Sequence, residues 1–157
     1  DFGAFDTVGF AQATATESGM VYKPDAEAIR FTGGNQVDSS NGVDPDIFVT
    51  GSLITLTLQV PGRVAMAFSG TAINSVSGNV TYFSIRIDDS STAMFGSQGL
   101  LFKQEVANHE NIVTLSGVSD ELSAGPHTFK VYFGNNSGSS TLFGNSAVGW
   151  RFSAWTI

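Results

Sequence analysis

The sequence predicts an all-β protein, and three observations support this fold class. Short runs of residues alternate between apolar and polar side chains, which is the period of a half-buried strand. Residues that favour turns, mainly Gly, Pro, Asn and Asp, separate these runs. No stretch sustains the 3.6-residue period of an amphipathic helix. Short strands with turns about every 8–12 residues are typical of a β-sandwich or a β-barrel.

The first part of the chain lacks such a pattern. Residues 1–22 are rich in Gly, Ala, Thr and Phe without a sustained period, so we interpret them as an arm or linker. The remaining residues, 23–157, have the length of a single domain. We therefore expect one β-sandwich domain over 23–157, with a first short strand at 27–32.

The clearest strand covers residues 52–60. Ile54, Leu56 and Leu58 alternate there with threonine and glutamine. Pro61-Gly62 then predicts a turn, since Pro fixes φ and Gly accepts a positive φ. Residues 63–69 alternate again, so the two runs are expected to form a β-hairpin.

The later strands are expected at 80–88, 100–106, 111–116, 122–133 and 149–157. The last of these is apolar on both faces. Trp150 and Phe152 share one face, whereas Trp155 and Ile157 share the other. A single sandwich core covers only one face of a strand. The sequence therefore predicts that Trp155, Ile157, Trp150 and Phe152 contribute to an oligomer interface.

Composition excludes several classes of partner. The net charge is −7, which gives no overall attraction to nucleic-acid phosphates or to anionic membranes. No apolar run approaches the roughly 20 residues of a membrane span. Cysteine is absent, so disulfides and thiolate metal sites are excluded. Only 13% of residues are charged, which predicts a surface of Ser, Thr, Asn and Gly.

No catalytic constellation is recognisable. The two histidines are His109, which lies beside Glu110 in an expected loop, and His127, which begins a strand. We expect His127 to be structural, with a ring nitrogen bonded to nearby backbone. Asp88-Asp89 follows a strand, and adjacent carboxylates there point apart, so a turn-capping role is favoured over the paired acids of a glycosidase. We predict no catalytic residues and no enzymatic activity.

Two sets of residues are candidates for ligand binding. Asp38, Asp44 and Asp46 place hard oxygen ligands in one run, which suits Ca²⁺ but does not match an EF-hand loop. No cofactor is predicted, and Ca²⁺ is kept as an alternative. Tyr82 and Tyr132 lie on the expected polar side of their strands, where aromatic rings stack on sugars or build subunit interfaces.

Three segments together carry a resemblance to a known family. These are Val60–Phe68, Ile85–Asp88 and Leu122–Val131, followed by the aromatic C-terminal strand. The chain from about residue 50 to 157 resembles the jelly-roll domains of bacteriophage fibre, tail and head-decoration proteins, which are similar to the C1q and tumour-necrosis-factor trimers. The resemblance implies an antiparallel two-sheet jelly-roll sandwich and a homotrimer with apolar C-terminal strands near its axis. It also implies binding to cell-surface glycans or proteins through exposed loops.

The leading hypothesis is a non-enzymatic structural or recognition domain of a virion, such as a fibre head, a tail appendage or a capsid decoration protein. Its partners would be copies of itself, other virion proteins, or a host-surface glycan or protein, in a virion or extracellular location. The alternative is a monomeric carbohydrate-binding module of a secreted bacterial protein, with Ca²⁺ as a further option. A small β-sandwich hydrolase or lyase ranks last, because the chain shows no catalytic constellation.

Overall fold

The computed structural model describes residues 14–15, 21–22, 26–30, 34–38, 47–90, 100–144 and 149–157. All regular structure within these ranges is β-strand. Consistent with this, none of the described segments is a helix long and apolar enough to cross a membrane.

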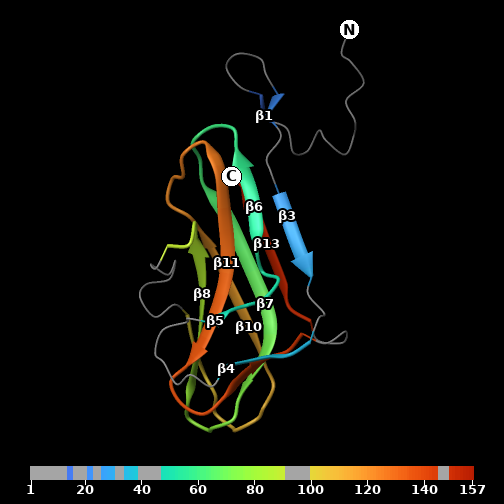
Figure 1. Ribbon diagram of the computed structural model, residues 1–157, viewed down its shortest axis with the longest axis vertical. Helices are drawn as coiled ribbons and strands as arrows, with labels where there is room; N and C mark the ends of the chain where they lie inside the picture. The colour runs from blue at the N-terminus through green and yellow to red at the C-terminus, as the bar shows by residue number, and fades with distance from the viewer. Residues whose placement is uncertain are drawn as a thin grey trace.

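The strands follow one another along the chain as β1 (Thr14–Ala15), β2 (Val21–Tyr22), β3 (Ala26–Arg30), β4 (Gln36–Asp38), β5 (Ile47–Phe48), β6 (Ile54–Leu58), β7 (Val64–Asn74), β8 (Val80–Ile87), β9 (Leu100–Lys103), β10 (Asn111–Val118), β11 (Gly125–Asn135), β12 (Ser140–Leu142) and β13 (Arg151–Thr156). Figure 1 shows the long strands β7, β8 and β11 running along the major axis of the molecule.

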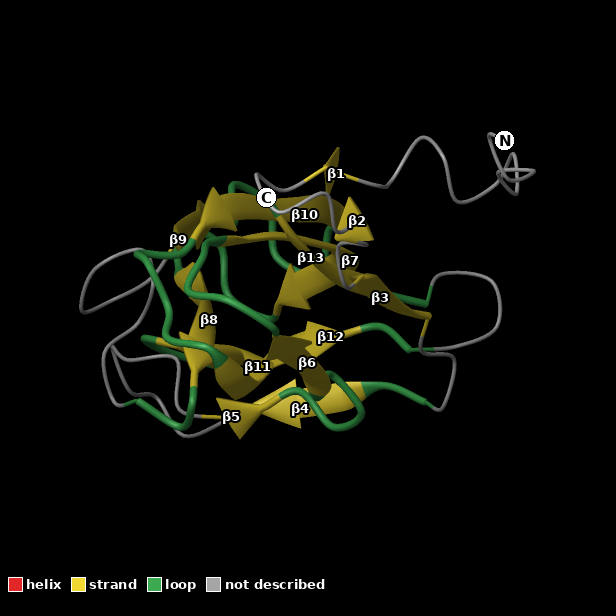
Figure 2. Cartoon of the chain, turned by 90° about the horizontal axis from the view of Figure 1, so that it is seen from above, coloured by secondary structure: helices red, strands yellow, loops and turns green. Residues whose placement is uncertain are grey.

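Two antiparallel sheets form the sandwich. In the first sheet, the long strand β7 pairs with β10 on one side and with β13 and β12 on the other. The edge strands β3 and β4 complete that sheet by pairing with β13 and β12. In the second sheet, β8 lies between β9 and β11, and β6 and β5 share the far side of β11. Figure 2 shows β10, β7 and β13 on one side of the molecule and β8, β11 and β6 on the other.

The chain changes sheets repeatedly, and this connectivity defines the fold. It passes from β6 to β7, from β7 to β8, from β9 to β10, from β10 to β11, and then to β12 and β13. Two packed antiparallel sheets joined by such crossings make a jelly-roll sandwich. The all-β, two-sheet class expected from the sequence is therefore confirmed.

The expected hairpin of residues 52–60 and 63–69 is wrong. Strands β6 and β7 lie in different sheets, where β6 pairs with β11 and β7 pairs with β10 and β13. Pro61-Gly62 carries the chain across the end of the sandwich, where Gly62 forms an isolated bridge with Leu122. Both strands still point their apolar residues into one core, so alternation alone could not distinguish a hairpin from a crossing.

Aromatic side chains fill the centre of the core. The ring centroids of Phe68 and Phe83 are 6.0 Å apart, and those of Phe83 and Phe133 are 6.1 Å apart. Trp150 closes the cluster with its ring 5.9 Å from Phe68. These distances are those of favourable aromatic pairs. The cluster spans both sheets, because Phe68 comes from β7 and the other two phenylalanines come from β8 and β11.

The last strand alternates as the sequence predicted, but its two faces differ in environment. Trp150 and Phe152 are fully buried between the sheets of the protomer. Their assignment to an oligomer interface is therefore wrong, because both side chains belong to the hydrophobic core of the single protomer. Trp155 and Ile157 lie on the opposite face and stay 38% and 66% exposed.

Candidate functional site

The outward side chains of β10, β7 and β13 form one continuous surface, which we name the β7 face. Antiparallel pairing aligns these side chains in rows across the three strands. The rows are Thr114–Ser69–Arg151, Ser116–Ala67–Ser153 and Val118–Ala65–Trp155. Because the central residue of each row is small, the face is flat along β7 and rises toward its two sides.

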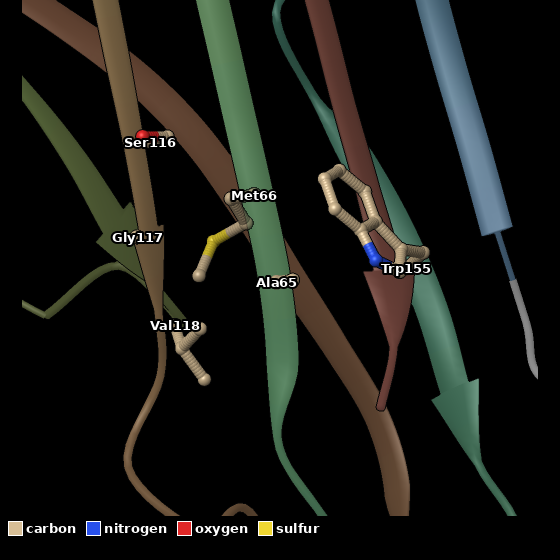
Figure 3. Close-up of a pocket in the computed structure, with 6 residues that line it drawn as sticks. All are labelled: Ala65, Met66, Ser116, Gly117, Val118 and Trp155. Carbon is tan, nitrogen blue, oxygen red and sulfur yellow. The ribbon is translucent and has the colours of Figure 1, made fainter.

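The β7 face is almost free of charge. Arg151 is the only ionisable side chain in the three rows, although the chain carries 14 acidic residues. The row at the Val118 end combines large exposed groups with a small centre. Val118 and Trp155 stand on either side of Ala65, and all three line a hollow of about 260 Å³ together with Met66, Ser116 and Gly117 (Figure 3). An uncharged, hollowed surface flanked by a tryptophan is typical of a protein interface.

The two predicted tyrosines have different environments. Tyr82 points away from the core but is only 6% exposed, so its ring offers no open platform. Tyr132 is half-buried on the outer face of the second sheet. The guanidinium carbon of Arg86 lies 4.2 Å from its ring centroid, and the ring of Phe48 lies 5.8 Å away. Lys130 extends toward Phe48 and pairs with the carboxylate of Asp89.

The predicted metal ligands are placed only in part. Asp38 is the last residue of strand β4, where its backbone pairs with Ser140. Asp44 and Asp46 lie outside the described residues. No group of three or more His, Asp or Glu side chains that could hold a metal occurs in the described part of the chain.

His127 connects three segments near one end of the second sheet. Its Nδ1 lies 2.6 Å from Oδ2 of Asp88, and its Nε2 lies 2.8 Å from the carbonyl oxygen of Ser123. The other carboxylate oxygen of Asp88 accepts a hydrogen bond from the backbone N–H of Thr128. These contacts match the structural role expected for His127 and the turn-capping role expected for Asp88. Asp88 and Asp89 both have a positive φ, which fits a tight turn after β8.

The protonation of this pair follows from its geometry. A carboxylate and a carbonyl oxygen can only accept, so both ring nitrogens of His127 donate when the imidazole is charged. Burial alone would lower the pKa of His127, but the bonds to Asp88 and Ser123 raise it above its ordinary value. Burial alone would likewise raise the pKa of Asp88, but the bonds from His127 and Thr128 lower it.

A buried polar cluster joins the two sheets at the C-terminal end of β7, where Asn74 is the last residue of the strand. The side-chain amide of Asn74 donates to the hydroxyl of Ser140 at 3.1 Å. The hydroxyls of Ser140 and Thr81 lie 2.7 Å apart, and all three residues are fully buried. None of these three residues was predicted from the sequence to have a role. Continuing the period of two from Met66 and Phe68 along β7 would have placed Asn74 on the inward face.

Comparisons with known proteins find solved structures that align with this chain at low sequence identity and with TM-scores below 0.5. No protein-family profile matches the chain, and no curated protein matches it in sequence. The structure of the Eiger TNF of S. frugiperda aligns with a TM-score of 0.46 and 12% identity over 84% of this chain and 92% of that chain. The VP2 subviral particle of infectious bursal disease virus aligns with a TM-score of 0.47 and 10% identity over 91% of this chain. A T=1 particle derived from the same virus aligns with a TM-score of 0.48 and 11% identity over 92% of this chain.

This chain spans 36% and 40% of the two viral proteins and so corresponds to less than half of their length. The jelly-roll assignment rests on the strand order and sheet crossings of the chain itself.

Proposed function

We propose that this chain is a non-enzymatic structural or recognition domain of a virion and that it self-associates through the β7 face, as a homotrimer. The observation that carries the proposal is the surface formed by the three rows that end in Arg151, Ser153 and Trp155, which holds no acidic side chain although the net charge of the chain is −7. Copies of an acidic protein repel one another, and this repulsion is weakest where the facing surfaces lack acidic groups. The β7 face is such a surface, and the large exposed group at its margin is a tryptophan, a residue enriched at interface hot spots.

The proposal assigns separate tasks to the parts of the chain. The β7 face, with Trp155 and Ile157, would hold the copies together. Residues 1–22 would form an arm in front of the sandwich domain 23–157, available to neighbouring virion proteins. The location would be a virion or the extracellular space, and the loops would contact a host-surface glycan or protein.

Light scattering on the full chain at tens of micromolar tests the proposal. We expect a mass near three times 16.5 kDa. Trp155→Lys places a charge in the contact and should reduce the mass to that of one copy. Thr57→Lys is the matched control, because Thr57 is an exposed residue of β6 on the outer face of the other sheet. A wild-type mass near 16.5 kDa at tens of micromolar would contradict self-association through the β7 face.

The alternative function, a carbohydrate-binding module, is favoured by one observation. Tyr132 and Phe48 form an aromatic pair flanked by Arg86 and Lys130, and Phe48 keeps 36% of its surface exposed. Sugar rings stack on exposed aromatic faces, and cationic side chains select acidic sugars. A glycan array with the wild type and with Phe48→Ala tests this function. Binding that the substitution abolishes would support the module, and Ca²⁺ dependence would show as a loss of binding in EDTA.

A further inference from the structure

Strand β10 is an open edge of the first sheet. It pairs with β7 through all eight of its residues, from Asn111 to Val118. Its other side has no strand partner among the described residues. Only Asn111, its first residue, makes further side-chain hydrogen bonds among the described residues, by donating to Gln104 and to the carbonyl oxygen of His109. Figure 2 shows β10 at the margin of its layer. Its outer N–H and C=O groups are therefore available for pairing.

This edge lacks the features that usually prevent pairing between molecules. Natural edge strands are protected by charged residues, by proline, by bulges or by being short. The residues from Asn111 to Val118 include no charged residue and no proline, and their register with β7 runs without a bulge. Ile112 is 81% exposed and Val118 is 48% exposed. An unprotected edge of eight residues with exposed β-branched side chains favours association with another strand.

We infer that β10 pairs antiparallel with β10 of a second copy, so that the first sheet continues from one protomer into the other. The contact would be isologous, with a twofold axis through Leu115. The register follows from the burial pattern, since residues opposite each other must lie on the same face of the combined sheet. Centring on Leu115 places Ile112 opposite Val118 of the second copy, and Thr114 opposite Ser116.

These cross-strand pairs are complementary. Ile112 and Val118 form an apolar pair, and the hydroxyls of Thr114 and Ser116 form a polar pair, each of a kind that stabilises antiparallel sheets. The two neighbouring registers that keep the faces aligned are worse. One places Val118 opposite Glu110, and the other places Ile112 opposite Asp120. Exposed apolar groups would then meet carboxylates, so the register centred on Leu115 is selected.

The same register predicts a charge contact at each end of the paired segment. Glu110 would lie opposite Asp120 of the second copy, and His109 would lie opposite Glu121. The first pair is repulsive, so pairing should end there and should strengthen as salt screens the charges. This twofold contact extends the proposed self-association but does not depend on a threefold axis. Combined with a threefold contact through the β7 face, it would build a hexamer or a larger lattice.

Residue-resolved amide hydrogen exchange on the full chain tests the pairing directly. In an edge strand, alternate amides point away from the neighbouring strand and exchange quickly. We expect all β10 amides to be protected at millimolar concentration. On dilution to single copies, every second amide from Ile112 to Val118 should exchange at least tenfold faster, while the amides of β7 stay protected.

A pair of charge variants tests the register. Asp120→Lys would turn the repulsive contact with Glu110 into an attractive one at both ends of the twofold interface, and should tighten association roughly tenfold. Glu121→Lys changes the net charge equally but faces His109, so it should not produce this gain. Equal effects of the two variants would overturn the register centred on Leu115.

The outcomes separate this inference from the proposed function. An assembled mass with alternate β10 amides that exchange quickly would overturn the edge pairing and leave self-association through the β7 face intact. A mass near twice 16.5 kDa with protected β10 amides would support the edge pairing and overturn the threefold arrangement. A single-copy mass at millimolar concentration would overturn both.

Discussion

The two tryptophans of the chain differ in burial. Substituting each of them by alanine therefore separates an effect on the core from an effect on the interface. Trp150 is fully buried against Phe68, whereas Trp155 is 38% exposed on the β7 face. Truncating a buried tryptophan removes its apolar contacts and leaves a cavity, which costs about 3–5 kcal/mol. For a chain of this length, that loss corresponds to a melting temperature lower by about 6–20 °C.

Trp155→Ala should act mainly on association. The exposed 38% of a side chain that buries up to about 250 Å² amounts to about 95 Å². Covering this area in an interface contributes about 2 kcal/mol per copy, or about thirtyfold in the dissociation constant. The cost to the free energy of unfolding of the single copy should be smaller, about 1 kcal/mol.

Urea unfolding followed by circular dichroism measures the free energy of unfolding of the wild type and of each variant. It is carried out at a concentration where light scattering reports one copy. Sedimentation at higher concentrations measures association. A greater loss of single-copy stability for Trp155→Ala than for Trp150→Ala would contradict the assignment of Trp150 to the core. Unchanged association of Trp155→Ala, in a protein that self-associates, would contradict the assignment of Trp155 to the interface.

Three further predictions concern stability. Gly70→Ala should cost about 1–3 kcal/mol by urea unfolding, because its Cβ would lie 3.0 Å from two core side chains; an unchanged midpoint would contradict this. Because the pKa of His127 is raised, its contribution to the free energy of unfolding is complete below about pH 6.5 and is lost as the pH rises through the raised pKa. Because the pKa of Asp88 is lowered, its contribution to the free energy of unfolding is complete above about pH 4 and is lost as the pH falls through the lowered pKa. Asp88→Asn, which tolerates the positive φ, should therefore be most costly between these values, and a pH-independent difference would argue against the pair. Asn74→Ala should cost about 1–3 kcal/mol in the same assay by leaving the buried Ser140 hydroxyl without its amide donor, and a neutral effect would show that the cluster adapts.

Alternation predicted which side chains share a face, but not what covers each face. Phe152 and Trp155 were correctly placed on opposite faces of β13, yet only the position of the second sheet decides that Phe152 is core. Tyr82 shows the same limit, since a residue on the outer face can still be buried. The pairing of β6 with β11 depends on residues about 70 positions apart, and no local pattern encodes it. His127 and Asp88 were given structural roles from the sequence, but their mutual contact arises only where β8 and β11 lie side by side.

The two outer faces of the sandwich differ in a way that bears on assembly. The outer face of the second sheet carries Arg86 and Lys130, with Asp89 paired to the lysine, so covering it would require several charges to lose water. The β7 face carries small residues and a single arginine across its three rows, and β10, the strand at its edge, is uncharged. Covering the β7 face and the β10 edge therefore costs far less desolvation per unit area. This asymmetry favours contacts between copies on the first sheet, and it leaves the charged second sheet and the loops open to a different ligand.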